Sequence, residues 1–162
     1  ASRIGAGSMF SFTLTLPLAP HLAVPQQESD FGGLDAGAAC SGVVLLVEDN
    51  VVNRMIGAEM LKSFGVDVLE AEDGAQSLAV LEQQHVDLVL MDIQMPVLDG
   101  YATTRLVRER EARLGLPRVP IVALTANAFD EDAAQSMAAG MDAHLAKPYS
   151  RQQLRELLQR WL

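Results

Sequence analysis

The hydrophobic positions of this chain fall into short apolar runs that alternate with longer amphipathic segments. Runs of five or six residues predict strands over residues 43–47, 66–71, 86–91, 120–124 and 142–146. Such runs, rich in Val and Leu, are typical of strands buried on both faces of a parallel sheet. Helical spacing of apolar residues predicts helices over residues 51–64, 73–84, 99–114, 130–139 and 150–162.

Strict alternation of strands and helices predicts an α/β fold with an open, doubly wound, five-stranded parallel sheet. Crossovers between parallel strands are right-handed, so helices are expected on both faces of the sheet. A closed barrel of this kind needs eight such units, which excludes it here. On the helix over residues 99–114 we expect a solvated face, formed by Arg105, Arg108, Glu109, Arg110 and Glu111.

Residues 1–42 lie outside this pattern. Phe10, Phe12, Leu14 and Leu16 alternate with polar residues, which predicts one half-buried strand and argues against a secretory signal peptide. Residues 21–42 are rich in Pro, Gly, Ala and Gln and show no sustained period, so they predict a flexible linker. We expect the structured core to begin near Val43.

Composition narrows the classes of function. The chain has 12 Lys and Arg against 21 Asp and Glu, a formal net charge of −9, which argues against nucleic acid as a direct partner. No apolar run reaches the length of a membrane span, so no direct membrane contact is expected for this chain. The single cysteine, Cys40, cannot form an internal disulfide, and the cytoplasm is the simplest location.

Polar residues follow four of the five predicted strands. Glu48 and Asp49 follow the first, Asp92 the third, Thr125 the fourth and Lys147 the fifth. The carboxyl ends of parallel strands form the ligand site of such sheets, so we expect these side chains to meet. Two carboxylates at ~4 Å repel by roughly 4 kcal/mol at an effective dielectric near 20, so the cluster needs a cation. Mg²⁺ fits best, because it prefers oxygen ligands.

Phosphoryl transfer to a carboxylate is the chemistry that needs this set of residues. Asp92 is the expected acceptor. Asp49, with Glu48 directly or through water, is expected to hold Mg²⁺. Lys147 is expected to pair with the acceptor carboxylate, and Thr125 to donate its hydroxyl to a phosphoryl oxygen.

Four segments occur in order along residues 43–162: residues 47–50 (VEDN), 91–100 (MDIQMPVLDG), 124–128 (LTANA) and 146–148 (AKP). Together they resemble the motifs of response-regulator receiver domains, over the whole of residues 43–162. The resemblance implies the flavodoxin-like strand order 2-1-3-4-5 and a phosphoryl group passed from a phosphohistidine to Asp92. It also implies a domain that catalyses its own phosphorylation and dephosphorylation without a separate substrate.

The resemblance further implies roles for individual residues. Mg²⁺, which Mn²⁺ could replace, is bound by Asp49, Asp92 and the backbone carbonyl of Gln94, and the peptide bond between Lys147 and Pro148 is cis. Phosphorylation draws Thr125 inward, and the side chain at position 144, an aromatic residue in most of the family, turns in behind it. Here that residue is His144, which either acts as the switch or is a partly exposed residue without a role. The helix over residues 130–139, the fifth strand and the last helix are the surface expected to change.

Gln94 and Asn127 occupy the positions at which family members tune dephosphorylation. The N-terminal segment, residues 1–20, resembles the last strand of the ATP-binding domain of a histidine kinase. Hybrid histidine kinases have this order of segments. The resemblance therefore implies that the parent of this chain is such a kinase, a transferase of phosphorus-containing groups that can be anchored in the inner membrane. The implied partners are a phosphohistidine domain of the kinase and a histidine phosphotransfer domain.

Three alternatives stay open. A stand-alone response regulator has the same receiver, although the sequence up to Leu162 contains no basic DNA-recognition element. A hydrolase of the haloacid-dehalogenase type also forms an aspartyl phosphate, but that family has a second Asp where this chain has Gln94. A pure interaction module would not need the complete acceptor set.

Overall fold

The computed structural model describes residues 2–3, 7–8, 40–126 and 130–162. It divides the chain into two compact units, Ala1–Ala36 and Gly37–Leu162. In the first unit, strands β1 (Ser2–Arg3) and β2 (Gly7–Ser8) pair antiparallel. The strand expected around residues 10–16 and most of the expected linker lie outside the described residues.

The second unit is built around a five-stranded parallel sheet. Its strands are β3 (Val43–Val47), β4 (Asp67–Ala71), β5 (Leu88–Asp92), β6 (Ile121–Thr125) and β7 (Ala143–Ala146). They are hydrogen-bonded in the order β4-β3-β5-β6-β7 with every pair parallel. Numbered along the chain within this unit, the order is 2-1-3-4-5, so the predicted fold is confirmed. The carboxyl ends of β3 and β5 therefore lie side by side.

The helices that connect and follow these strands are α1 (Val51–Lys62), α2 (Gly74–Gln83), α3 (Gly100–Leu114), α4 (Asp130–Ala139) and α5 (Arg151–Trp161). Four begin at a cap whose side chain accepts a backbone N–H: Asn50, Asp73, Asp99 and Ser150. Such caps stabilise helix starts because they satisfy donors that have no partner within the helix. Asp73 and Asp99 were expected inside their helices, and each helix in fact begins one residue later.

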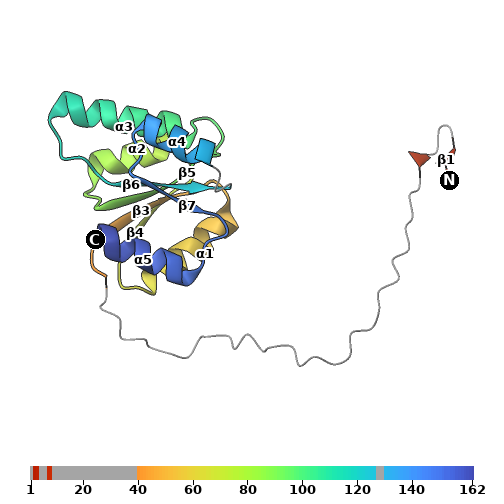
Figure 1. Ribbon diagram of the computed structural model, residues 1–162, viewed down its shortest axis with the longest axis horizontal. Coiled ribbons are helices and arrows are strands. Elements are labelled where there is room, and N and C mark those ends of the chain that lie inside the picture. Colours follow the sequence, from red (N-terminus) through yellow and green to blue (C-terminus); the bar gives the residue numbers. More distant parts are fainter. Residues whose placement is uncertain (1, 4–6, 9–39, 127–129) are drawn as a thin grey trace. The chain divides into compact units, whose positions relative to one another are not determined.

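Side chains of the strands alternate between two cores, one on each face of the sheet. In β3, Val44 and Leu46 belong to the core that α1 and α5 cover, and Leu45 and Val47 belong to the core on the other face. Figure 1 shows α1 and α5 on one side of the sheet and α2, α3 and α4 on the other. Burial on both faces explains why the three central strands, β3, β5 and β6, are almost wholly apolar in sequence.

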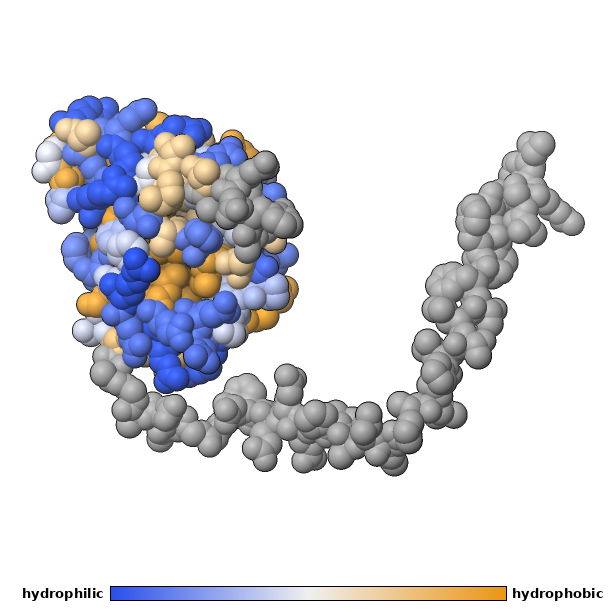
Figure 2. Space-filling model, in the orientation of Figure 1, coloured by the Kyte–Doolittle hydropathy of each residue, from blue (hydrophilic) through white to orange (hydrophobic). Residues whose placement is uncertain are grey.

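In the view of Figure 2, the surface of this unit is mainly hydrophilic over the helices, and apolar residues show between the helices, over the sheet. No helix within the described ranges is both long and apolar enough to span a membrane. A run of exposed apolar side chains lies at the start of α1: Val51, Val52, Met55 and Ile56.

The expectation of a solvated face on α3 was wrong for Arg108 and Glu111. Their side chains are only 13% and 10% exposed. Arg108 donates to Glu111 Oε2 at 2.8 Å and to Asp142 Oδ2 at 2.8 Å. Asp142 lies 34 residues away in the sequence, so no local pattern reveals the partner. Arg105 and Glu109 are exposed, as expected.

Gly100, at the first position of α3, allows the helix to approach the end of β5. A Cβ at this position would lie 2.3 Å from the carbonyl oxygen of Asp92, and backbone cannot move aside cheaply. We expect Gly100→Ala to lower the free energy of unfolding by about 3 kcal/mol, measured by urea denaturation. Gly115 ends the same helix at φ 64°, and a Cβ there meets nothing within 4 Å. Gly115→Ala should therefore cost only about 1 kcal/mol, and an equal loss in both variants would contradict the close-approach argument.

Candidate functional site

The carboxyl ends of four strands bring the expected polar residues to one edge of the sheet. Glu48 and Asp49 follow β3, Asp92 ends β5, Thr125 ends β6 and Lys147 follows β7. One carboxylate oxygen from each of the three acids lies within 4.8 Å of the other two. The fold therefore assembles the acidic cluster that the sequence predicted, with the lysine beside it.

Lys147 bridges two of the three acids. Its Nζ lies 2.8 Å from Asp92 Oδ2 and 2.5 Å from Glu48 Oε2. Glu48 and Asp92 are buried, with 2% and 6% of their surface exposed. The backbone N–H of Lys147 donates to the carbonyl of Thr125 at 2.7 Å. The peptide bond between Lys147 and Pro148 is cis, which confirms the expectation from the resemblance.

For Asp92 and Lys147, burial shifts the pKa in one direction, and the hydrogen bond and opposite charge between them shift it in the other. Burial raises the pKa of the Asp92 carboxyl above its ordinary value; the hydrogen bond and charge of Lys147 oppose this shift, and Glu48 adds to it. For Lys147, burial acts to lower the pKa, but hydrogen bonds to Asp92 and Glu48 outweigh burial and raise it. The lysine is thus held as an ammonium between two carboxylates.

The three carboxylates differ in what already binds them. Both oxygens of Glu48 are occupied, since Oε1 accepts from Asn53 Nδ2 at 3.0 Å and Oε2 from Lys147. Asp49 is exposed, and its carboxylate accepts no hydrogen bond from the residues that the structure describes. Asp49 therefore offers ligand atoms that no protein group in the described part of the chain takes.

The sequence did not single out two residues of α1 that hold the acid pair. Asn53 binds the Glu48 carboxylate, and Arg54 Nη1 donates to the carbonyl oxygens of Glu48 at 2.6 Å and Asp49 at 3.4 Å. The only signal was position, because both residues lie in the first turns of the helix that directly follows the acid pair. At such positions an Asn and an Arg are ordinarily solvated.

The loop between β5 and α3 closes the site on another side. The backbone N–H of Gln94 donates to Asp92 Oδ1 at 3.2 Å, so each oxygen of the Asp92 carboxylate has a donor. Gln94 itself is exposed. The backbone N–H of Gly100 donates to the carbonyl of Ile93 at 3.0 Å, which anchors the far end of the loop.

Val97, in this loop, has an unusual backbone conformation. Its φ is 68°, the backbone N–H of Leu98 donates to the carbonyl of Pro96 at 2.8 Å, and the side chain is 94% exposed. A β-branched residue at positive φ is strained by roughly 1–2 kcal/mol, whereas Asn tolerates this region. We expect Val97→Asn to raise the free energy of unfolding by about 1 kcal/mol, measured by urea denaturation. Val97→Ala keeps a Cβ without the branch and is the matched control; equal stability of the two variants would contradict the assignment of strain.

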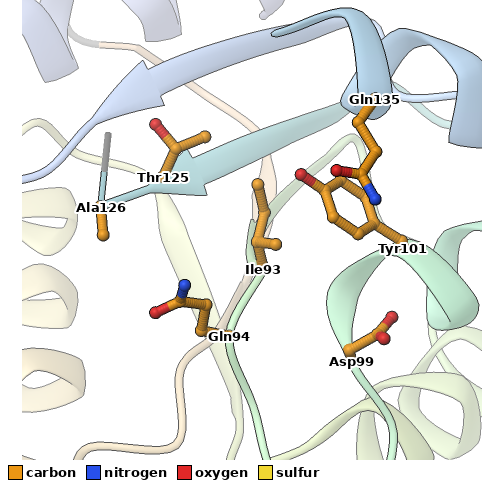
Figure 3. A pocket seen from close by; sticks show the side chains of 7 residues that line it. All are labelled: Ile93, Gln94, Asp99, Tyr101, Thr125, Ala126 and Gln135. Atoms are coloured by element: carbon orange, nitrogen blue, oxygen red, sulfur yellow. The ribbon is translucent and has the colours of Figure 1, made fainter. Parts of the chain in front are cut away.

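Two cavities flank the site. The first, of about 360 Å³, is lined by Ile93, Gln94, Asp99, Tyr101, Thr125, Ala126 and Gln135. In Figure 3, Tyr101, at the start of α3, and Gln135, in α4, lie on the side of this cavity opposite Thr125. The second, of about 440 Å³, is lined by Glu48, Asn53, Ile56, Met60, Ala126, Lys147, Pro148 and Tyr149. The sequence predicted no role for Tyr101 or Gln135.

The structure describes two of the three residues expected to tune dephosphorylation or to turn in behind Thr125, namely Gln94 and His144. Asn127 lies outside the described residues. Gln94 lines the first cavity. His144, opposite Ala123 in the register of β6 and β7, is exposed. The structure therefore gives His144 as a surface residue of the edge strand.

The donor set fits a hard divalent cation. All the candidate ligands are carboxylate oxygens, the Lys147 ammonium contacts only two of the three acids, and the third, Asp49, is exposed. Mg²⁺ is bound in proteins by one or two carboxylates together with water and phosphate oxygens. Asp49 matches that description best, because Glu48 is already held by Asn53 and Lys147, and Asp92 by Gln94 and Lys147.

Comparison with known proteins agrees with the geometry. The family model described as response regulator receiver domain matches residues 44–159. The hybrid signal transduction histidine kinase L of Dictyostelium discoideum is 41% identical over 123 residues, a match covering 74% of this chain and 7% of the kinase. The chain thus spans a small part of the length of this curated relative.

Two solved structures extend the comparison. The receiver domain of sensor histidine kinase PA1611 from Pseudomonas aeruginosa, with a magnesium ion coordinated in its active site cleft, is 46% identical with a TM-score of 0.67; the match covers 75% of this chain and 97% of that one. A chain of the complex between the Saccharomyces cerevisiae histidine phosphotransfer protein Ypd1 and the receiver domain of Ssk1 is 28% identical with a TM-score of 0.74, covering 77% and 91%. By its family match, its strand order and its acidic site, this chain belongs to the response regulator receiver domain family.

Proposed function

We propose that this receiver accepts a phosphoryl group from a phosphohistidine onto Asp92 and so acts as a phosphorelay module. The observation that carries the proposal is Lys147 Nζ held between Asp92 and Glu48, with the Asp49 carboxylate in the same cluster. The Asp92 carboxylate is paired with the Lys147 ammonium, and the Asp49 carboxylate beside it has no cationic partner among the described residues. Such a site can bind a divalent cation and, with it, an anionic phosphoryl group.

The chemical step divides among the residues of the site. An oxygen of the Asp92 carboxylate attacks phosphorus, the phosphorus–nitrogen bond breaks, and its electron pair stays on the imidazole nitrogen. Lys147 stabilises the negative charge that the phosphoryl oxygens bring. Thr125 donates its hydroxyl to one of those oxygens.

Asp49, Asp92 and the backbone carbonyl of Gln94 are the groups proposed to hold the cation, with Glu48 acting through water. Bound Mg²⁺, or Mn²⁺ in its place, supplies the positive charge that lets an anionic donor approach an acidic site. The magnesium ion in the active site cleft of the PA1611 receiver supports Mg²⁺ as the cation by similarity.

The start of α1 is proposed to dock the phosphohistidine-bearing domain. Val51, Val52, Met55 and Ile56 are between 52% and 61% exposed, and Ile56 also lines the cavity that reaches Lys147. An apolar surface beside a reactive site indicates a protein partner. The complex of Ypd1 with the receiver of Ssk1 supports a histidine phosphotransfer domain as that partner.

Thr125 is the proposed start of the switch, and Gln94 and Asn127 are proposed to tune dephosphorylation. The readout through His144 is tested by His144→Tyr, which restores the family's aromatic residue. We expect unchanged phosphorylation by a small phosphodonor and a changed preference between histidine phosphotransfer partners, measured as transfer rates. Loss of phosphorylation in this variant would show that His144 acts on the chemistry.

The proposed parent is a hybrid histidine kinase, in which residues 1–20 end the ATP-binding domain and residues 21–42 form the linker. The hybrid kinase from Dictyostelium supports this by similarity. The proposed location of this receiver is the cytoplasm. Sequencing the gene upstream tests this: a different domain in place of a kinase core would contradict the parentage and leave the receiver assignment intact.

Phosphorylation itself is tested on the wild-type chain with phosphoramidate and Mg²⁺, followed by intact-mass spectrometry. The proposal predicts a single added phosphoryl group that hydrolyses with time and forms about a hundredfold more slowly, or slower still, when a chelator removes Mg²⁺. A chain that gains no phosphoryl group from phosphoramidate, acetyl phosphate or a phosphorylated histidine phosphotransfer domain would overturn the proposed function.

A further inference from the structure

Arg54 contacts the site from behind, through the backbone. Its Nη1 donates to the carbonyl oxygen of Glu48 at 2.6 Å and to that of Asp49 at 3.4 Å. Its Nε lies 3.8 Å from Glu70 on β4, and the Arg54 side chain is only 15% exposed. The guanidinium is therefore fixed between the acid pair and the neighbouring strand.

Among the described residues, few groups other than Arg54 hold the backbone carbonyls of Glu48 and Asp49. Strand β3 ends at Val47, and the helix begins at Val51 behind the cap Asn50. The N–H of Glu48 still donates to Ala71 at 3.1 Å. Asp49, in contrast, has no side-chain hydrogen bond from the described residues, so the direction of its carboxylate depends on how its backbone is held.

We propose that Arg54 is a positioning residue for the metal site: it clamps the backbone carbonyls of Glu48 and Asp49 and so aims the Asp49 carboxylate at the cluster. This inference rests on the proposed function, since it assigns Asp49 as a metal ligand. Mg²⁺ tolerates little deviation from octahedral geometry, and partners that orient its ligands commonly contribute tenfold to a hundredfold in affinity.

Losing the clamp and losing the positive charge of Arg54 are expected to change the Mg²⁺ affinity in opposite directions. Arg54 carries a positive charge close to the acidic cluster and, as a charge, repels a divalent cation. Removing only that charge would tighten Mg²⁺ binding. Removing the clamp weakens it, so the direction of the change separates the two roles of the residue.

The test measures Mg²⁺ binding to the full chain, with the metal alone, by isothermal titration calorimetry. Arg54→Met should raise the Mg²⁺ dissociation constant by about tenfold or more. Arg54→Lys keeps the charge but loses Nε, the second nitrogen, which faces Glu70 while Nη1 donates to the carbonyls, so it should also bind Mg²⁺ more weakly than wild type. Lys62→Met is the matched control, because Lys62 lies on the same helix and also contacts Glu70, at 3.8 Å.

Each outcome decides between the two roles. Weaker binding in both Arg54 variants, with Lys62→Met equal to wild type or slightly tighter, supports the clamp. Binding by Arg54→Met as tight as wild type or tighter overturns it, as does wild-type affinity in Arg54→Lys. Wild-type protein that binds no Mg²⁺ would overturn the proposed metal site itself. Melting curves recorded on the same samples confirm that each variant is folded, and Arg54→Lys carries the test if Arg54→Met is not.

Discussion

Asp92→Asn is expected to abolish phosphorylation while leaving the fold intact. The amide has nearly the shape of the carboxylate, and its single oxygen can still accept one of the two native hydrogen bonds, from Lys147 at 2.8 Å or from Gln94 at 3.2 Å. It lacks the negatively charged oxygen that must attack phosphorus. After incubation with phosphoramidate and Mg²⁺, intact-mass spectrometry should find no added phosphoryl group. A full adduct on this variant would place the acceptor elsewhere.

The same substitution should stabilise the metal-free protein at neutral pH. Burial raises the pKa of Asp92 in the folded state above its ordinary value of 3.8, so ionised Asp92 destabilises the fold. That penalty is present above the folded pKa and disappears as the pH falls below the unfolded value. The melting temperature of Asp92→Asn should therefore exceed that of wild type near pH 7 and match it below about pH 3.8. A lower melting temperature at neutral pH would mean that the pair with Lys147 outweighs burial.

Asp49→Asn, or removal of Mg²⁺ by a chelator, is expected to slow phosphorylation about a hundredfold or more, because the cation contributes several kcal/mol to charge stabilisation in such reactions. Asp49 is the acid of the cluster whose carboxylate accepts no hydrogen bond from the described residues. Losing it leaves the arrangement of Lys147, Glu48 and Asp92 in place. The rate is measured by intact mass against time at saturating Mg²⁺.

Asp67→Asn is the control for charge, because Asp67 is an exposed carboxylate at the amino end of β4, away from the site. It should phosphorylate at the wild-type rate. Equal slowing in both variants would attribute the effect to net charge, and an unaffected Asp49→Asn would remove Asp49 from the metal site.

The fold was predictable because the three central strands, β3, β5 and β6, are buried on both faces. Near-continuous apolar runs and helical spacing between them leave few alternatives once crossovers must be right-handed. Element ends were predicted less well. In sequence, Asp73 and Asp99 fit a helix cap and a first helical turn equally well. In the structure their side chains accept backbone N–H groups of the helix, so both are caps.

The site was predictable where residues follow strands, since strand ends converge whatever the details of packing. It was not predictable where a contact depends on the rotation of a helix. Arg54 reaches back to the acid pair, and Arg108 finds Asp142 across 34 residues. A sequence pattern gives the type and spacing of such residues and says nothing about which way a long side chain turns.

The positive φ of Val97 was also beyond the sequence, because β-branched residues ordinarily avoid that region. The anchors on both sides of the loop, at Asp92 and Gly100, leave the backbone little choice.

The central claim, that Asp92 carries the phosphoryl group, is tested most directly by trapping the acyl phosphate. Wild-type protein is phosphorylated with phosphoramidate and Mg²⁺ and then reduced with borohydride, which converts an aspartyl phosphate to homoserine. Peptide mapping by mass spectrometry should find homoserine at position 92 and unmodified Asp49. Homoserine at any other position, or an adduct that resists borohydride and maps to a Ser, Thr or His, would contradict the account.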